Sequence, residues 1–300
     1  MKKTALLLVA GLAAAFAGAA RADGFKPAAV PASVCWIWHV DVQGLKGSET
    51  GRALLADPSL AESPQVAAFT ARFGLDPAKD LKSLTVYTVS TGRLDAVAVL
   101  EPAAAAGARL QAWRETAGYK SQSYGRHTIY GKPGEPGAPY QAAMPDGRIV
   151  AALTLDRMQL GLDVLDGKRE SLKASALPAL SDRKAGDGAL VILTGKAFGP
   201  DVQGVLPQIA LLRKANSLCL VVGEKDGRVS AGLSVCADDD AEAERLQNAL
   251  LGFVEIGRAM AGDSAQPGFT DTVAVTREGR TIRADGKWTT DQVLKMMGHR

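Results

Sequence analysis

Hydrophobic residues alternate with polar ones over several stretches of the chain, which is typical of half-buried β-strands. Residues 83–90 (SLTVYTVS) and 93–100 (RLDAVAVL) alternate in this way around Thr91-Gly92, a hairpin signal. Residues 34–42 (VCWIWHVDV) are instead apolar on both faces, so we expect this strand in the middle of a sheet. Further strands are predicted at 119–130, on both sides of 145–147, and at 189–195, 217–236 and 271–284.

Apolar residues at helical spacing predict helices between these strands. The clearest helix covers residues 64–73, where Ser63 is the N-cap, Pro64 takes the first helical position and Gly74 follows the last. The other helices are predicted at 49–57, 103–117, 155–166, 201–214, 239–261 and 290–297. The acidic residues 238–240 begin one of them, and we interpret them as helix-capping residues rather than a calcium loop.

The order of elements is similar in the two halves of the chain. Residues 92–96 (GRLDA) match 227–231 (GRVSA), and residues 109–111 (RLQ) match 245–247 at nearly the same offset. We therefore expect an α+β fold of two similar modules that arose by internal duplication, each a mostly antiparallel sheet with helices on one face. The modules are predicted at 23–167 and 189–300, joined by a polar linker at 168–188. The open faces of the two sheets are expected to pack against each other.

Residues 1–22 have the pattern of a secretory signal peptide: a basic start, an uncharged apolar run over 5–16, and Ala20-Arg21-Ala22 as the cleavage signal. The apolar run is shorter than the ~20 residues needed to span a bilayer. We therefore expect an exported soluble protein, periplasmic or secreted, with no transmembrane segment after signal cleavage.

The formal net charge of +3 lies entirely in this leader, which contains Lys2, Lys3, Arg21 and no acidic residue. The remaining chain is neutral, with 32 basic and 32 acidic residues. A neutral chain lacks the field that attracts phosphate backbones, so we expect no nucleic-acid partner.

Two stretches in the first half resemble the opening of exported bacterial proteins of unknown function. They are residues 38–48 (WHVDVQGLKGS) with 51–55 (GRALL), and residues 74–77 (GLDP) with 80–84 (DLKSL). The resemblance implies a setting in the bacterial envelope and carries no known activity or site.

His39, Asp41 and His127 are the candidate site residues. His39 and Asp41 are two apart on a strand and point to the same face, as a metal pair or a base with its orienting carboxylate would. A metal site needs at least a third ligand, and His127 is the other histidine in the folded body. In the alternative interpretation, His39 is a sheet residue with satisfied hydrogen bonds and Asp41 caps the following loop.

The chain contains three cysteines, Cys35, Cys219 and Cys236, and the disulfide state of Cys35 stays open. A hairpin turn centred on Lys225-Asp226 would place Cys219 opposite Gly232, four residues short of Cys236. That separation exceeds the reach of a disulfide, so we expect no Cys219–Cys236 bridge.

The sequence contains no P-loop, Gly-x-Ser-x-Gly, His-Glu-x-x-His or Cys-x-x-Cys motif, and no cofactor is predicted. The leading hypothesis is a non-enzymatic envelope protein with a binding or structural role, whose partner is an envelope protein or a small molecule. The alternatives are an exported metal-assisted hydrolase and a small-ligand binder with its site between the modules. A hydrolase requires the three candidate residues to converge, whereas a partner-binding protein should show an exposed apolar patch.

Overall fold

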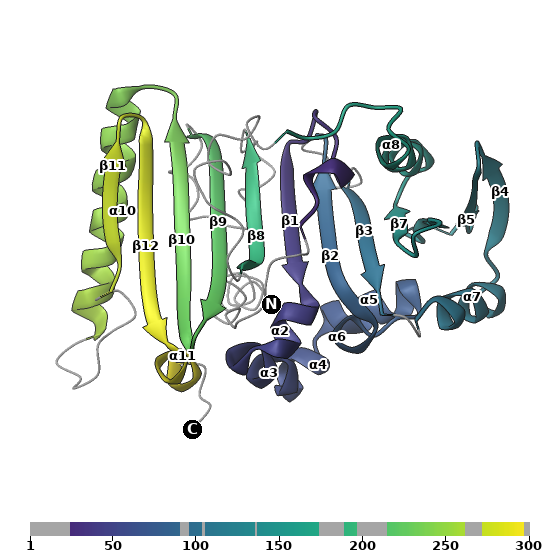
Figure 1. The fold of residues 1–300 in the computed structure, drawn as a ribbon, viewed down its shortest axis with the longest axis horizontal. Helices are drawn as coiled ribbons and strands as arrows, with labels where there is room; N and C mark the ends of the chain where they lie inside the picture. Colours follow the sequence, from purple (N-terminus) through teal and green to yellow (C-terminus); the bar gives the residue numbers. More distant parts are fainter. Residues whose placement is uncertain are drawn as a thin grey trace.

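A single antiparallel sheet dominates the computed structural model, which describes residues 25–90, 96–103, 106–135, 137–173, 189–196, 215–261 and 272–296. Its twelve strands have the order β11-β12-β10-β9-β8-β1-β2-β3-β7-β6-β5-β4 (Figure 1). The strands are β1 (Trp36–Asp41), β2 (Leu81–Thr88), β3 (Ala96–Pro102), β4 (Lys120–Tyr124), β5 (His127–Gly131), β6 (Tyr140–Ala143), β7 (Ile149–Ala152), β8 (Ala189–Lys196), β9 (Ala215–Lys225), β10 (Arg228–Ala237), β11 (Ala274–Glu278) and β12 (Thr281–Thr289).

Helices connect the strands and cover the sheet, so the fold is α+β as expected. They are η1 (Pro27–Ala29), α2 (Val42–Gly47), α3 (Glu49–Ala56), α4 (Pro58–Ala61), α5 (Pro64–Phe73), α6 (Pro77–Asp80), α7 (Ala106–Thr116), α8 (Leu155–Leu165), α10 (Asp240–Ala261) and α11 (Thr290–Met296). In the part of the chain that the structure describes, none of these is both long and apolar enough to cross a membrane.

The apolar strand β1 lies at the centre of the sheet, as its sequence predicts. Trp38 is opposite Val86 of β2 on one side and opposite Leu193 of β8 on the other. The two halves of the chain therefore join edge to edge within one sheet. The expectation that two separate sheets pack face to face is wrong, because β1 uses its second hydrogen-bonding edge to continue the sheet into β8.

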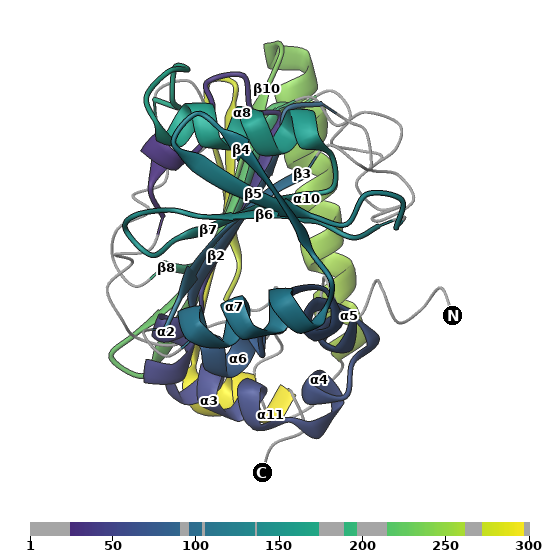
Figure 2. The same cartoon turned by 90° about the vertical axis from the view of Figure 1, so that its right-hand side faces the viewer.

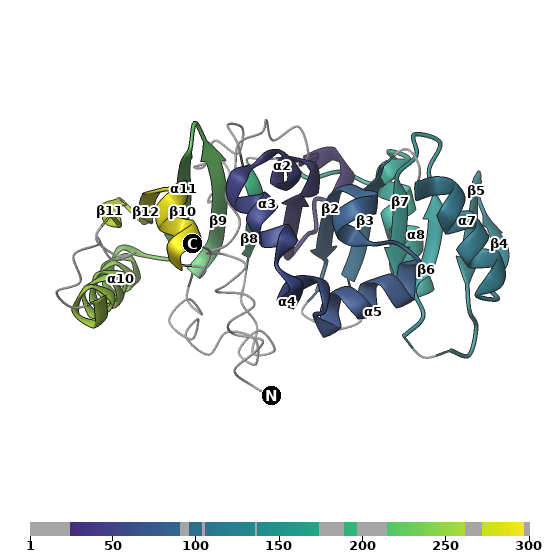
Figure 3. The same ribbon diagram turned by 90° about the horizontal axis from the view of Figure 1, so that it is seen from below.

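Helices cover both faces of the sheet rather than one. On one face, Met158 and Leu162 of α8 pack against Tyr87, Val97 and Val150 of the strands. On the other face, a second apolar cluster includes residues of α2, α3, α5, α7 and α11. Figure 2 shows the sheet between α8 and the pair α6 and α7, and Figure 3 shows α2 to α5, α7 and α11 from below.

Helix α10 lies on the same face as α11, because Val229 and Val235 point to one side of β10. Val229 packs in the cluster around α11, whereas Val235 packs with Ala243 and Leu246 of α10. The described molecule therefore has α8 on one side of the sheet and the other long helices on the opposite side.

Helix α5 begins and ends where the sequence predicts. The Ser63 hydroxyl oxygen accepts a hydrogen bond from the Val66 amide at 3.3 Å. Gly74 ends the helix at φ 65°, a left-handed conformation, and a Cβ there would lie 2.3 Å from the Trp113 ring. Both the backbone conformation and the close ring therefore require glycine.

The β9–β10 hairpin has a turn one residue later than expected. Asp226 and Gly227 occupy it with φ of 53° and 69°, and Lys225 is opposite Arg228. This two-residue turn with positive φ at both positions matches the right-handed twist of the strands. Cys219 consequently lies opposite Ser234 rather than Gly232, and no disulfide joins Cys219 to Cys236.

The structure does not confirm an internal duplication. In the described part, seven strands lie on the β1 side of the β1–β8 contact and five on the β8 side. Of the predicted linker, Ser171 forms a β-bridge with Pro31 and Leu172 is buried, whereas 174–188 lies outside the described residues. The helix predicted at 201–214 also lies outside them.

Candidate functional site

The structure does not bring the three candidate residues together. His39 lies on β1 and Asp41 at its end, whereas His127 lies on β5, with β2, β3, β7 and β6 between the two strands. At ~4.8 Å between neighbouring strands, β1 and β5 are about 24 Å apart. The described part of the chain also contains no group of three or more His, Cys, Asp or Glu residues placed to hold a metal.

His39 is buried in the sheet, with 1% of its surface exposed. Its Nδ1 is 2.8 Å from the Thr85 hydroxyl on the neighbouring strand, and its ring lies 5.5 Å from that of Phe25. Nε2 is buried without a hydrogen-bond partner. Burial lowers the pKa of His39 to about 4, so the imidazole is neutral near pH 7.

Asp41 caps the helix that follows β1. Its Oδ1 accepts a hydrogen bond from the Gly44 amide at 2.8 Å. A Cβ at Gly44 would lie 2.7 Å from Asp41 Oδ2 and from Leu190, so glycine is needed for this close approach. The interpretation of Asp41 as a capping residue is confirmed.

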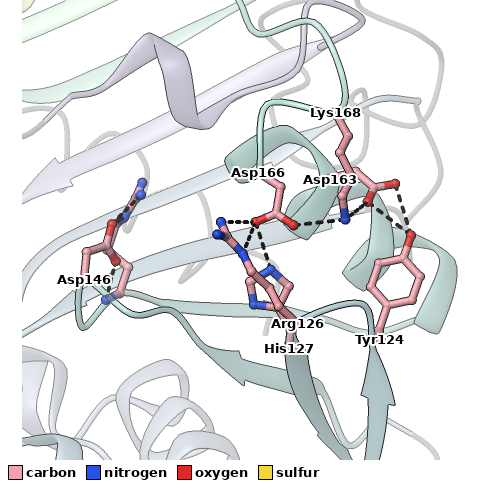
Figure 4. A network of polar contacts seen from close by, with 8 residues as sticks. Tyr124, Arg126, His127, Asp146, Asp163, Asp166 and Lys168 are labelled. Carbon is pink, nitrogen blue, oxygen red and sulfur yellow. Dashed lines mark hydrogen bonds and ion pairs between the residues drawn. The ribbon is translucent and has the colours of Figure 1, made fainter.

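His127 belongs to a network of ion pairs between the β4–β5 hairpin and the end of α8 (Figure 4). Its Nε2 lies 2.9 Å from Oδ1 of Asp166, whose side chain is 4% exposed. The same oxygen accepts from Arg126 Nη2 at 2.7 Å, and Lys168 Nζ lies 3.0 Å from Oδ2. Burial would raise the pKa of Asp166, but the hydrogen bonds from Lys168, Arg126 and His127 hold it well below its usual range.

A second carboxylate, Asp163, extends this network. It accepts a hydrogen bond from the Tyr124 hydroxyl at 3.1 Å and lies 3.6 Å from Lys168 Nζ. Asp163 and Asp166 both lie at the carboxyl end of α8, where the helix dipole is unfavourable to acids. The surrounding cations compensate for that position, so the network joins the hairpin to α8 and is suited to a structural role.

The sequence pattern indicates His127 as a candidate but gives no sign of its partner Asp166. The two residues are 39 positions apart, and the spacing of residues within one helix or strand says nothing about such a contact. Only the packing of α8 against the sheet places them together.

An open cleft of about 430 Å³ lies at the ends of β2, β3 and β7. Lys26 and Glu101 form an ion pair across it at 2.7 Å, and Arg148 pairs with Asp146 in the turn before β7 (Figure 4). Every residue that lines the cleft belongs to the first half of the chain. This cleft is therefore not the site between the halves that a small-ligand binder was expected to have.

Helix α10 carries an exposed apolar surface that sequence analysis did not single out. In the described part of the chain, the exposed large hydrophobic residues are Leu251, Phe253 and Ile256. All three belong to one stretch of six residues inside α10. Phe253 and Ile256 are three residues apart and so neighbour each other on one flank, with 52% and 58% of their surfaces exposed. The sequence Leu250 to Ile256 (LLGFVEI) is apolar around most of the helix, which is the signal that could have indicated them.

The start of α10 agrees with the sequence interpretation. Asp239 Oδ1 accepts a hydrogen bond from the Glu242 amide at 2.7 Å. Asp239 therefore caps the helix as expected, whereas Asp240 lies in its first turn and the Asp238 carboxylate lies 3.4 Å from Asn216.

Comparisons with known proteins give a fold and no function. No protein-family model matches the chain, and no curated protein matches it. Among solved structures, crystal form III of TP0453 matches with a TM-score of 0.55 at 10% identity, covering 92% of this chain and 98% of that one. Crystal forms I and IV match with TM-scores of 0.52 at 11% identity, over 92% of this chain and 97% of theirs. The chain shares the fold of TP0453. At this identity the shared fold carries no site and no activity.

Proposed function

We propose that this chain is an exported, non-enzymatic envelope protein that binds another protein through the exposed apolar flank of α10. The observation that supports the proposal is the pair of exposed large hydrophobic side chains, Phe253 and Ile256, which neighbour each other on one flank of the helix. Exposed apolar groups that gather on one element, rather than scatter singly, are typical of interaction sites.

The polar network around Asp166 fits this function better than it fits catalysis. Asp163 and Asp166 are surrounded by cations and a phenol that join β4, β5 and α8. Cations held in this way stabilise the carboxylates and leave the network in a structural role. His39 and His127 lie on strands too far apart to share a substrate.

The charge on α10 favours a protein partner over a membrane surface. The helix contains four acidic residues, Asp240, Glu242, Glu244 and Glu255, and two basic residues, Arg245 and Arg258. Helices that bind anionic lipid are rich in Lys and Arg on their polar face. A net negative helix with exposed Phe and Ile is better matched to the apolar patch of another protein.

Site-specific photo-crosslinking in the intact envelope tests this proposal. A photo-reactive p-benzoylphenylalanine replaces Phe253 or Ile256 in the full chain, and a control replaces Lys120 on β4 at the far edge of the sheet. We expect ultraviolet light to join positions 253 and 256 to the same single protein, and position 120 to give no such product. The partner is then purified, and the proposal requires that it bind the mature chain directly in solution.

Three results would contradict the proposal. They are crosslinks from 253 and 256 to lipid only, crosslinks only to a second copy of this chain, and an identical product from position 120.

A further inference from the structure

Arg114 is a buried cation in a different part of the molecule, on α7. It is 3% exposed and lies one helical turn after the buried Leu110, so α7 turns this side chain toward the sheet. There it meets Tyr130 of β5 and Gln141 of β6.

No carboxylate balances this guanidinium. Within the residues that the structure describes, no Asp or Glu oxygen lies within 4 Å of Arg114. Its Nε donates to Gln141 Oε1 at 3.3 Å, its guanidinium carbon lies 4.7 Å from the centre of the Tyr130 ring, and Nη2 is buried without a hydrogen-bond partner. The more exposed Arg109 and Arg126, by contrast, each have an aspartate partner.

A guanidinium stays charged at any ordinary pH, and a buried charge without a counter-ion is costly. Burial lowers the pKa of Arg114, which is the sign of this unfavourable environment. The ring face of Tyr130 offsets only part of the cost. An anion supplied from solution would complete the hydrogen bonds of the guanidinium and balance its charge.

Among the groups around Arg114, the Gln141 amide oxygen is an acceptor for its guanidinium. Gln141 Nε2 donates to the Arg72 carbonyl at 3.2 Å and lies 3.4 Å from the Tyr119 hydroxyl, which turns the amide oxygen toward Arg114. A second cation, Lys132, lies with Nζ 5.3 Å from the Tyr119 ring. Lys132 is paired with Glu135 at 3.0 Å, so Arg114 is the cation at this junction that has no carboxylate partner in the described part of the chain.

We propose that Arg114 is the anion-binding residue of a second site, at the junction of α7, β5 and β6, which takes a small oxyanion, a phosphate or a carboxylate. The planar donors of the guanidinium match the oxygens of either group, and Tyr119 and Lys132 provide the outer contacts. This site is separate from the apolar flank of α10 and goes beyond the proposed function.

Thermal unfolding of the mature chain tests the site, with sodium phosphate or sodium acetate compared with sodium chloride at constant pH and ionic strength. We expect a saturable rise in the midpoint, by roughly 5 °C at a hundredfold excess of anion over its dissociation constant. The anion that acts at the lower concentration identifies the ligand class as phosphate or carboxylate.

Arg114→Met is the decisive variant, and Arg126→Met, which removes an exposed arginine on the neighbouring hairpin, is its matched control. In chloride, Arg114→Met should unfold at the same or a higher temperature than the wild type, because an unbalanced buried charge is gone. In phosphate or acetate, the wild type and Arg126→Met should gain stability and Arg114→Met should not. Equal gains in all three chains, or no gain in the wild type, would overturn the proposal.

Equilibrium dialysis with labelled phosphate and acetate provides a second readout that does not depend on the folding of Arg114→Met. We expect one anion per wild-type chain and binding at least threefold weaker for Lys132→Gln. Absence of stoichiometric binding of both anions, or unchanged binding in Lys132→Gln, would overturn the site.

Discussion

His39 shows at the residue scale how burial can convert a candidate catalytic group into a structural one. Its folded-state pKa of about 4 lies below the ordinary value of 6.5, so the unfolded chain binds a proton more readily than the folded chain between these pH values. Stability attributable to His39 should therefore be complete above about pH 6.5 and decline by roughly 3 kcal/mol as the pH falls to about 4. In urea titrations, His39→Gln should remove this part of the pH dependence. An identical pH profile in wild type and variant would contradict the assignment.

Asp166 gives a pH dependence of the same sign in a lower pH range, because its pKa is also depressed in the folded state. Its contribution to stability should be present above about pH 4 and lost as the pH falls below that value. Asp166→Asn removes the negative charge that the buried His127 and two cations share and replaces one accepting oxygen by an NH2 group, and it should cost about 1–3 kcal/mol at pH 7 by urea unfolding. Asp146→Asn breaks an exposed pair with Arg148 and should cost less than about 1 kcal/mol. Equal losses in the two variants would show that the network contributes no more than a surface pair.

At the scale of elements, the β9–β10 turn depends on two residues with positive φ. Gly227→Ala should lower the free energy of unfolding by about 1 kcal/mol, because a side chain disfavours the left-handed conformation at φ 69°. Asp226→Asn should be nearly neutral, since Asn tolerates the same conformation. Denaturant midpoints of the two variants test this turn, and a loss in Asp226→Asn as large as that in Gly227→Ala would contradict it.

Most helices and strands could be predicted because their signals are local. Ser63, Pro64 and Gly74 define α5 through capping and backbone preference, and the alternation in β2 and β3 predicts their hairpin. The observed β9–β10 register differs from the predicted one by two residues. The turn lies at Asp226 and Gly227 because these residues adopt positive φ more readily than Lys225 does. One residue in a turn thus moves every cross-strand partner, including that of Cys219.

At the scale of the whole molecule, the join between β1 and β8 is the feature that local patterns could not predict. Both faces of β1 are apolar, which correctly indicates a central strand, but nothing in Trp36 to Asp41 specifies a partner some 150 residues later. Three other features appear only in the folded chain for the same reason. They are the contact of His127 with Asp166, the lack of a counter-ion at Arg114 and the exposure of Phe253. The continuous sheet predicts that backbone amides of β1 and β8 open together in native-state hydrogen exchange. Separate opening of β8 would contradict a single sheet.

Helix α10 is proposed to bind a protein partner, and the buried histidines are proposed to take no part in that contact. The most direct measurement uses the partner that crosslinking identifies, purified without the crosslink. Its dissociation constant is measured for the wild-type chain, for the double variant Phe253→Ser/Ile256→Ser, and for His39→Gln. Loss of two exposed apolar anchors should weaken binding at least tenfold without unfolding the chain, whereas His39→Gln should bind as the wild type does. Unchanged affinity in the α10 variant, or a matching loss in His39→Gln, would contradict the account.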